Sequence, residues 1–197
     1  MKSIPKDVVI IGTNRSLAKW NMKNNRPMNY YLVNNPYSEC MSFLPTEHRY
    51  YPTCISSIRT NPDFILRYRG QKVKYYPTFE KTFSQTAKDA RCSIDDYRNP
   101  ICAAISVAYQ MKATKILLFC CDDSFDGERP GAEKLKNGLW TYPQHLLANS
   151  LVEGNMYWLS HQPYKRIRIG LHSSGPECEN LPYINEDSLC NFFESEL

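Results

Sequence analysis

The stretch Asp7-Val-Val-Ile-Ile-Gly-Thr-Asn-Arg-Ser-Leu17 decides the fold class that we expect for this chain. Its apolar run, rich in β-branched residues, favours a strand buried on both faces, as in a parallel sheet. Gly12 permits a sharp turn out of that strand, and Ser16 is a candidate cap for the helix that follows. Backbone N–H groups at the start of a helix favour anions, so this turn predicts a bound nucleotide phosphate.

The turn keeps only the first glycine of the dinucleotide-binding motif G-x-G-x-x-G. Asn14 can stand in for a glycine, because asparagine tolerates a left-handed backbone better than most residues. Thr13 and Ser16 add polar side chains, and the Arg15 guanidinium matches the geometry of phosphate oxygens. The alternative interpretation is an ordinary strand-to-helix turn without a ligand.

Size and composition predict one globular domain over residues 1–197. The hydrophobic content of 42% and the aromatic content of 13% are typical of a packed core rather than of disorder. The net charge of +4 is mild, and the chain has no dense Lys/Arg run. We therefore expect an anionic small molecule as the partner, and no nucleic acid.

The sequence predicts a cytoplasmic protein without a membrane span. No apolar stretch approaches the roughly 18 residues that a spanning helix needs, and the first strand begins too early to leave room for a signal peptide. The chain has 8 cysteines, but none form a C-x-x-C pair or a zinc-binding spacing with histidine. Cys102, Cys120 and Cys121 are expected to be buried as small hydrophobic residues.

Strand and helix patterns alternate along the chain. A helix is favoured after Asn99-Pro100, because asparagine caps helices and proline suits their first position. Ile101, Ala104, Ile105 and Ala108 form its expected apolar stripe. Strands are expected at 29–34, 53–58, 64–68, 73–76, 115–121 and 166–170, helices at 78–90, 99–112, 142–159 and from 185, and a loop at 122–137. This order predicts an α/β fold, namely a single Rossmann-like three-layer domain with a mostly parallel sheet and helices on both faces.

Polar residues directly follow several of the predicted strands. In open α/β sheets ligands bind beyond the carboxyl ends of the strands, at a switch in strand order. The groups in question are Gly12 to Ser16, Asn34-Asn35, Asp122-Asp123 and His172. We expect them to line one polar cleft.

Asp122 and Asp123 are the strongest candidates for catalysis. Adjacent carboxylates at a strand end can hold Mg²⁺, with water and phosphate oxygens completing its coordination. The alternative is that they cap a turn or pair with Arg129. His172 is a candidate acid or base, although a structural role is the more common one. Asn99 either helps to hold a ligand or simply caps its helix.

The turn G-T-N-R-S-L, the 99–108 helix and the following strand with Asp122-Asp123 resemble the archaeal hydroxymethyldihydropterin diphosphokinase-like family. Its members typically show a G-x-G-P-S-L turn and an aspartate at that strand end. Gly12, Ser16, Leu17 and Asp122 match this pattern, whereas Asn14 and Arg15 replace its second glycine and its proline. The Rossmann-like core is also similar to bacterial sialyltransferases and motility-associated glycosyltransferases.

The resemblance implies a transferase that acts on a nucleotide phosphate. In the diphosphokinase form, Mg²⁺ on Asp122 and Asp123 bridges the phosphates of ATP, and a small hydroxymethyl, pterin-like acceptor is modified. In the glycosyltransferase form, a nucleotide sugar is the donor, and His172 assists the leaving phosphate or the acceptor hydroxyl. A third interpretation is a non-catalytic Rossmann-like module that binds a nucleotide or a protein partner.

Overall fold

The computed structural model describes residues 5, 7–14, 16–18, 27–45, 50–78, 93–96, 99–119, 127–134, 138, 140–141 and 168–172. The chain divides into two compact units. One is Asp7–Val107, and the other combines Met1–Lys6 with Ala108–Leu197. The prediction of a single domain over residues 1–197 stays a prediction.

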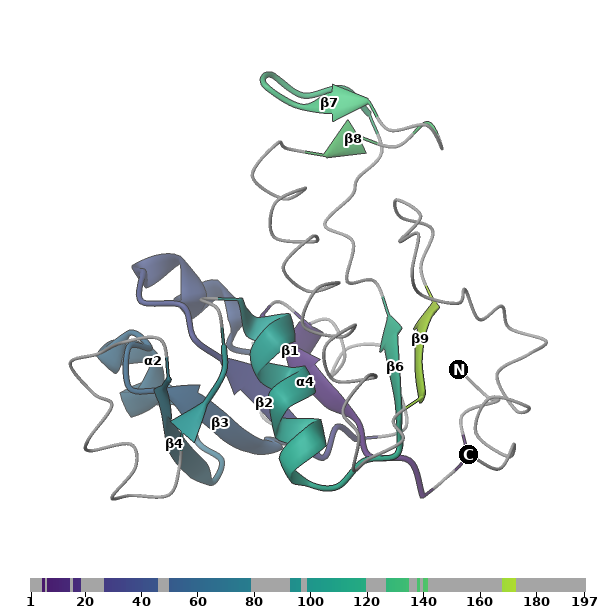
Figure 1. Ribbon diagram of the computed structural model, residues 1–197. Coiled ribbons are helices and arrows are strands. Elements are labelled where there is room, and N and C mark those ends of the chain that lie inside the picture. Colours follow the sequence, from purple (N-terminus) through teal and green to yellow (C-terminus); the bar gives the residue numbers. More distant parts are fainter. Residues whose placement is uncertain are drawn as a thin grey trace. The chain divides into compact units, whose positions relative to one another are not determined.

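The Asp7–Val107 unit contains a five-stranded sheet in which every pair of neighbouring strands is parallel. The order of the strands in the sheet follows the sequence, and among these described strands it contains no reversal. The expected α/β fold with a parallel sheet is confirmed. The strands are β1 (Ile11–Thr13), β2 (Tyr30–Val33), β3 (Thr53–Ser57), β4 (Lys72–Pro77) and β5 (Ser93–Ile94), as Figure 1 shows.

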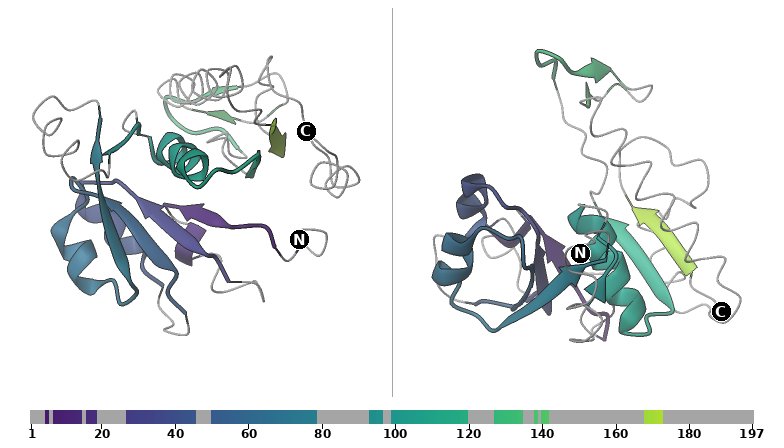
Figure 2. Two further views of the ribbon diagram at one scale, coloured as in Figure 1. Left: turned by 60° about the horizontal axis from the view of Figure 1, so that its bottom comes forward. Right: turned by 60° about the vertical axis from the view of Figure 1, so that its left-hand side comes forward.

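Side chains alternate between the two faces of the sheet along each strand. Because both faces carry buried apolar side chains, helices cover both of them. Tyr31 and Val33 of β2 pack with η1 (Ser38–Phe43) and α2 (Pro62–Arg67), whereas Leu32 packs with α4 (Pro100–Gln110). The left view of Figure 2 shows α4 and α2 on opposite sides of the strands. The three-layer arrangement is therefore confirmed within this unit. The first face buries Leu17, Tyr31, Val33, Cys40, Phe43, Cys54, Phe64 and Tyr68, and the second buries Leu32, Ile55, Tyr75, Ile94, Ala103 and Val107.

The first strand is shorter than its apolar run suggested. Residues 8–10 are not part of a strand, and Val9 is 52% exposed, so the expectation of a strand buried on both faces from Val8 is wrong. Among the strands that the structure describes, β1 lies at one end of the strand order and pairs only with β2. Just before β1, the Ile10 N–H donates to the side chain of Asn29, at 2.8 Å, instead of to a neighbouring strand.

The expected strand at 64–68 is wrong, because most of this segment belongs to α2. Asn61 caps that helix: its side-chain oxygen accepts from the N–H groups of Asp63 at 2.9 Å and Phe64 at 3.4 Å. Pro62 occupies the first helical position, where a missing N–H costs nothing. The strands expected near 29–34, 53–58 and 73–76 are present as β2, β3 and β4.

The helix expected after Asn99 is confirmed as α4, which ends two residues before Lys112, a residue in the left-handed conformation with φ 64°. Its expected apolar stripe is only partly correct. Ile105 is buried, but Ile101, Ala104 and Ala108 are only half-buried. The buried face of α4 is therefore formed by a different set of residues from the expected stripe. The buried residues are Cys102, Ala103, Ile105, Ser106 and Val107.

In the second unit, β6 (Lys115–Phe119) pairs in parallel with β9 (Arg168–His172). Both strands were expected, although β9 continues to His172, two residues beyond the expected end. The expected loop at 122–137 is wrong at Glu133–Lys134, which forms β7 and pairs antiparallel with β8 (Trp140–Thr141). The helices expected at 78–90, at 142–159 and from 185 lie outside the described residues, apart from the turn residue Thr78. Among the residues that the structure describes, no helix is long and apolar enough to cross a membrane.

Candidate ligand site at the carboxyl edge of the sheet

The turn after β1 has the left-handed residue expected at Asn14, but Gly12 does not form the turn. Asn14 has φ 48°, which confirms its left-handed conformation. The Tyr31 hydroxyl donates to the Asn14 carbonyl at 2.9 Å and holds the turn against β2. Gly12 lies inside β1 rather than in the turn. A Cβ there would overlap Met28 Sδ and lie 2.7 Å from Ser16 Oγ, so this glycine leaves room for the Met28 and Ser16 side chains.

A helical segment follows the turn at 16–18, as expected. Within it, the Ser16 hydroxyl oxygen is buried and has no hydrogen-bond partner among the described residues. Thr13 is half-buried and pairs with Leu32 across the β1–β2 ladder. Arg15, the predicted phosphate contact, lies outside the described residues.

Asn34 and Asn35 follow β2, as predicted, but their side chains behave differently. Asn34 is only 8% exposed, and its Nδ2 has no hydrogen-bond partner among the residues that the structure describes. The Asn35 side chain is engaged within its own loop: its Oδ1 accepts from the Tyr37 N–H at 2.8 Å, and its Nδ2 donates to Glu39 at 2.9 Å. Asn35 therefore shapes the loop that carries Tyr37.

The loop after β3 is tied to the loop after β2. The Thr60 hydroxyl donates to the carbonyl of Val33 at 2.9 Å. The Asn61 N–H donates to the carbonyl of Asn35 at 3.0 Å, and the Asn61 Nδ2 donates to that of Pro36 at 3.4 Å. These bonds fix the two loops as one rigid wall at the carboxyl edge of the sheet.

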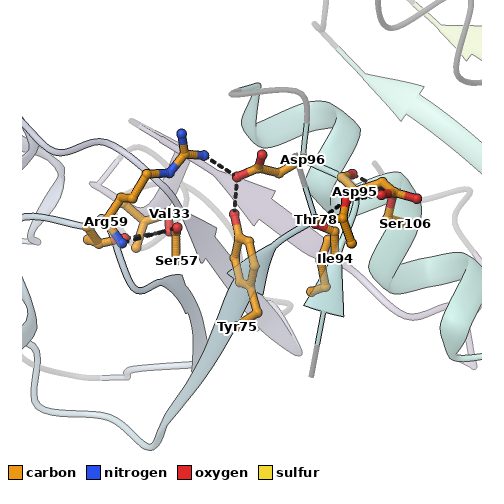
Figure 3. A network of polar contacts seen from close by, with 10 residues as sticks. Val33, Ser57, Arg59, Tyr75, Thr78, Ile94, Asp95, Asp96 and Ser106 are labelled. Carbon is orange, nitrogen blue, oxygen red and sulfur yellow. Dashed lines mark hydrogen bonds and ion pairs between the residues drawn. The ribbon is translucent and has the colours of Figure 1, made fainter. Parts of the chain in front are cut away.

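A charged network lies at the same edge, at the ends of β3, β4 and β5 (Figure 3). Arg59 Nη2 donates to Asp96 Oδ2 at 2.6 Å, and the Tyr75 hydroxyl donates to the same oxygen at 3.1 Å. The Asp96 side chain is fully buried and that of Arg59 is 20% exposed. Burial and the neighbouring Asp96 carboxylate raise the pKa of Tyr75 well above its ordinary value, so Tyr75 stays a neutral donor.

The residues around Asp96 are fixed by α4. Asp95 accepts a hydrogen bond from Thr78 through its side chain and one from Ser106 of α4 through its carbonyl, at 2.7 Å. The Asn99 N–H donates to the Asp96 carbonyl at 2.6 Å, and Asn99 Oδ1 accepts from the Ile101 N–H at 2.8 Å. Of the two interpretations of Asn99, helix capping is therefore observed, and its contact with a ligand stays a prediction.

A pocket of about 230 Å³ opens beyond β2 and β3. Its described lining combines a buried amide, an arginine and two rings. These residues are Asn34, Pro36, Tyr37 and Arg59. The Tyr37 side chain is 69% exposed, so one ring of the lining is accessible from solvent.

The remaining candidates belong to the second unit. The backbone of His172 ends β9 and is paired with Phe119, the last residue of β6. Asp122 and Asp123 follow Phe119 closely in the sequence but lie outside the described residues. Among the described part of the chain, no group of three or more His, Cys, Asp or Glu side chains could hold a metal ion. In particular, Asp96 is already bonded to Arg59 and Tyr75.

Sequence reasoning missed the network around Asp96 and the pocket side chains Tyr37 and Arg59. A signal for Arg59 was present, since it lies two residues after the end of β3, and Asn34 directly follows β2. Asp96 was harder to find, because it follows β5, a strand of only 2 residues. Comparisons with protein-family models, with curated proteins and with solved structures found no match for this chain.

Proposed function

We propose that this protein is a nucleotide-phosphate-dependent transferase, with its nucleotide bound at the carboxyl edge of the five-stranded sheet. One observation carries the proposal. Ser16 Oγ and Asn34 Nδ2, beyond the adjacent strands β1 and β2, are buried without a partner among the described residues. A buried polar group without a hydrogen bond costs about 1–3 kcal/mol. A ligand that supplies both partners is therefore favoured.

The position of these two groups supports a nucleotide as that ligand. Ligands of open α/β sheets bind outside the carboxyl ends of the strands. The left-handed Asn14 lets the chain turn sharply into the segment at 16–18, so that backbone N–H groups can face a phosphate.

The reaction that we propose first is diphosphoryl transfer from ATP to a small hydroxymethyl, pterin-like acceptor. Asp122 and Asp123 are the proposed ligands of Mg²⁺, which when bound offsets charge on the phosphates. The turn from Gly12 to Ser16 positions the phosphate oxygens, and Arg15 adds a guanidinium to them. In this scheme the protein acts mainly by orientation and electrostatic stabilisation.

A glycosyltransferase with a nucleotide-sugar donor is the second candidate. The pairing of His172 with Phe119 favours a glycosyltransferase. The backbone of His172 lies beside Phe119, the last residue of β6, and Asp122 follows Phe119 by three residues in the sequence. An imidazole there would assist the leaving phosphate or accept a proton from the acceptor hydroxyl.

A thermal-shift screen with ATP, GDP, UDP and CMP, each with and without Mg²⁺, tests the proposal. A ligand at about 100 times its Kd stabilises the native state by about 2.7 kcal/mol. The diphosphokinase form predicts that Mg²⁺ raises the affinity for ATP and that Asp122→Asn abolishes this gain. Stabilisation by a nucleoside mono- or diphosphate, without a response to ATP, would favour the glycosyltransferase. No shift with any nucleotide, together with a protein partner in a pull-down, would favour the non-catalytic module.

A further inference from the structure

We propose that the pocket beyond β2 and β3 binds the heterocyclic base of the nucleotide, with Tyr37 stacked on the base and Asn34 bonded to its edge. This inference rests on the nucleotide binding proposed above and assigns one part of the ligand to one set of side chains. The lining residues that the structure describes all belong to the Asp7–Val107 unit.

The charge of the pocket favours a neutral ring over a phosphate. Arg59 is its one charged lining residue among those described, and the Asp96 carboxylate at 2.6 Å balances that charge. The other walls include the rings of Pro36 and Tyr37. Flat apolar walls suit an aromatic ring, because every base has a face that stacks on an aromatic side chain.

The volume of the pocket also points to one ring system rather than a whole nucleotide. It is about 230 Å³, below the roughly 300–1,000 Å³ of sites that enclose drug-sized ligands. The ribose and phosphates would then extend outside the pocket. The turn after β1, at the same edge of the sheet, is where the proposed phosphate contacts lie.

Asn34 gives the pocket its polar selectivity. Its Nδ2 is a hydrogen-bond donor that is buried and has no partner among the described residues. The edges of bases carry ring nitrogens and carbonyl oxygens that accept such a bond. The loops that carry Asn34 and Arg59 are bonded to each other through Thr60 and Asn61, so the site is formed before a ligand arrives.

Calorimetric titration of the full chain tests this assignment. The probes are ATP, GDP, UDP and CMP, their four nucleosides, ribose 5-phosphate and tripolyphosphate. Tyr37→Ala should weaken the tightest nucleotide and its nucleoside by roughly 10-fold or more, because it removes the stacking ring. Tyr37→Phe should retain the affinity. Leu66→Ala is the matched control, since Leu66 is a large apolar residue that is 79% exposed outside the pocket.

A second variant probes the polar contact. Asn34→Asp keeps the shape of the side chain but replaces the donor nitrogen by an acceptor oxygen, and it should weaken the same ligands by at least 10-fold. Thermal unfolding shows whether this variant stays folded. If Asn34→Asp does not fold, the Tyr37 variants still decide the test, because substitution at an exposed position leaves the fold intact.

The outcomes separate this inference from the proposed function. If nucleotides bind but Tyr37→Ala has no effect, and tripolyphosphate or ribose 5-phosphate binds as tightly, the base assignment is wrong and the function stands. If nucleosides bind through Tyr37 but phosphates add no affinity, the base assignment stands and the function is wrong. If no nucleotide or nucleoside binds, both are wrong.

Discussion

Removing the Arg59 guanidinium should destabilise the protein by leaving the Asp96 carboxylate buried without its ion pair. The pair joins Arg59 Nη2 and Asp96 Oδ2 at 2.6 Å, and the Asp96 side chain is fully buried. Breaking a buried pair typically costs about 3–5 kcal/mol. Because Arg59 is 20% exposed, and water can partly replace it, we expect about 3 kcal/mol for Arg59→Met.

Urea unfolding measures this loss as a lower midpoint at an unchanged slope. Arg69→Met is the matched control, because Arg69 is exposed in the same unit, and it should change the stability by no more than about 0.5 kcal/mol. A second substitution should restore part of the lost stability. Asp96→Asn should raise the stability of the Arg59→Met protein, because it removes the buried negative charge that has lost the Arg59 guanidinium. A loss no larger than that of the control, or a double variant less stable than Arg59→Met, would refute the explanation.

Three further predictions concern the same unit. Gly12→Ala should lower the free energy of unfolding by about 1–3 kcal/mol, because the new methyl group would overlap the buried Met28 side chain and force it to move; an unchanged urea midpoint would contradict this. Asn61→Ala should cost about 1 kcal/mol of stability by uncapping α2, and Asn61→Asp, which keeps the capping oxygen but loses the donor to Pro36, should cost less, as circular dichroism during urea unfolding would show. Burial raises the pKa of Cys54 from 9.0 to about 12, so the native state holds this proton longer than the unfolded state does, and stability should fall as the pH rises from 9 toward 12. Cys54→Ala should make that fall shallower by up to about 1.4 kcal/mol per pH unit, and equal slopes between pH 9 and 11 would contradict the assignment.

The elements that local patterns determine were predictable from the sequence. The apolar runs at β2 and β3 and the Asn99-Pro100 start of α4 each have a local cause, and each is present. The 64–68 segment was misassigned because a short apolar run fits a strand or a buried helix equally well by periodicity. The Asn61-Pro62 pair was the deciding signal, since it repeats the pattern that correctly identified α4.

The features that depend on tertiary packing were not predictable. Gly12 was expected to make a turn, but its role comes from Met28, which the fold brings against β1. Arg59 and Asp96 are 37 residues apart in the sequence and meet only because β3 and β5 both pair with β4. The pocket beside Asn34 likewise depends on hydrogen bonds between two loops that no local pattern specifies.

Mapping amide chemical shifts in solution shows whether a nucleotide binds at the carboxyl edge of the five-stranded sheet. The nucleotide that stabilises the protein most is titrated into isotopically labelled full chain. We expect the amides of Asn14, Asn34 and Tyr37 to shift, while those of Gln71 and Thr53, at the amino ends of β4 and β3, keep their positions. Shifts confined to the amino ends, or no shifts with any nucleotide, would contradict this expectation.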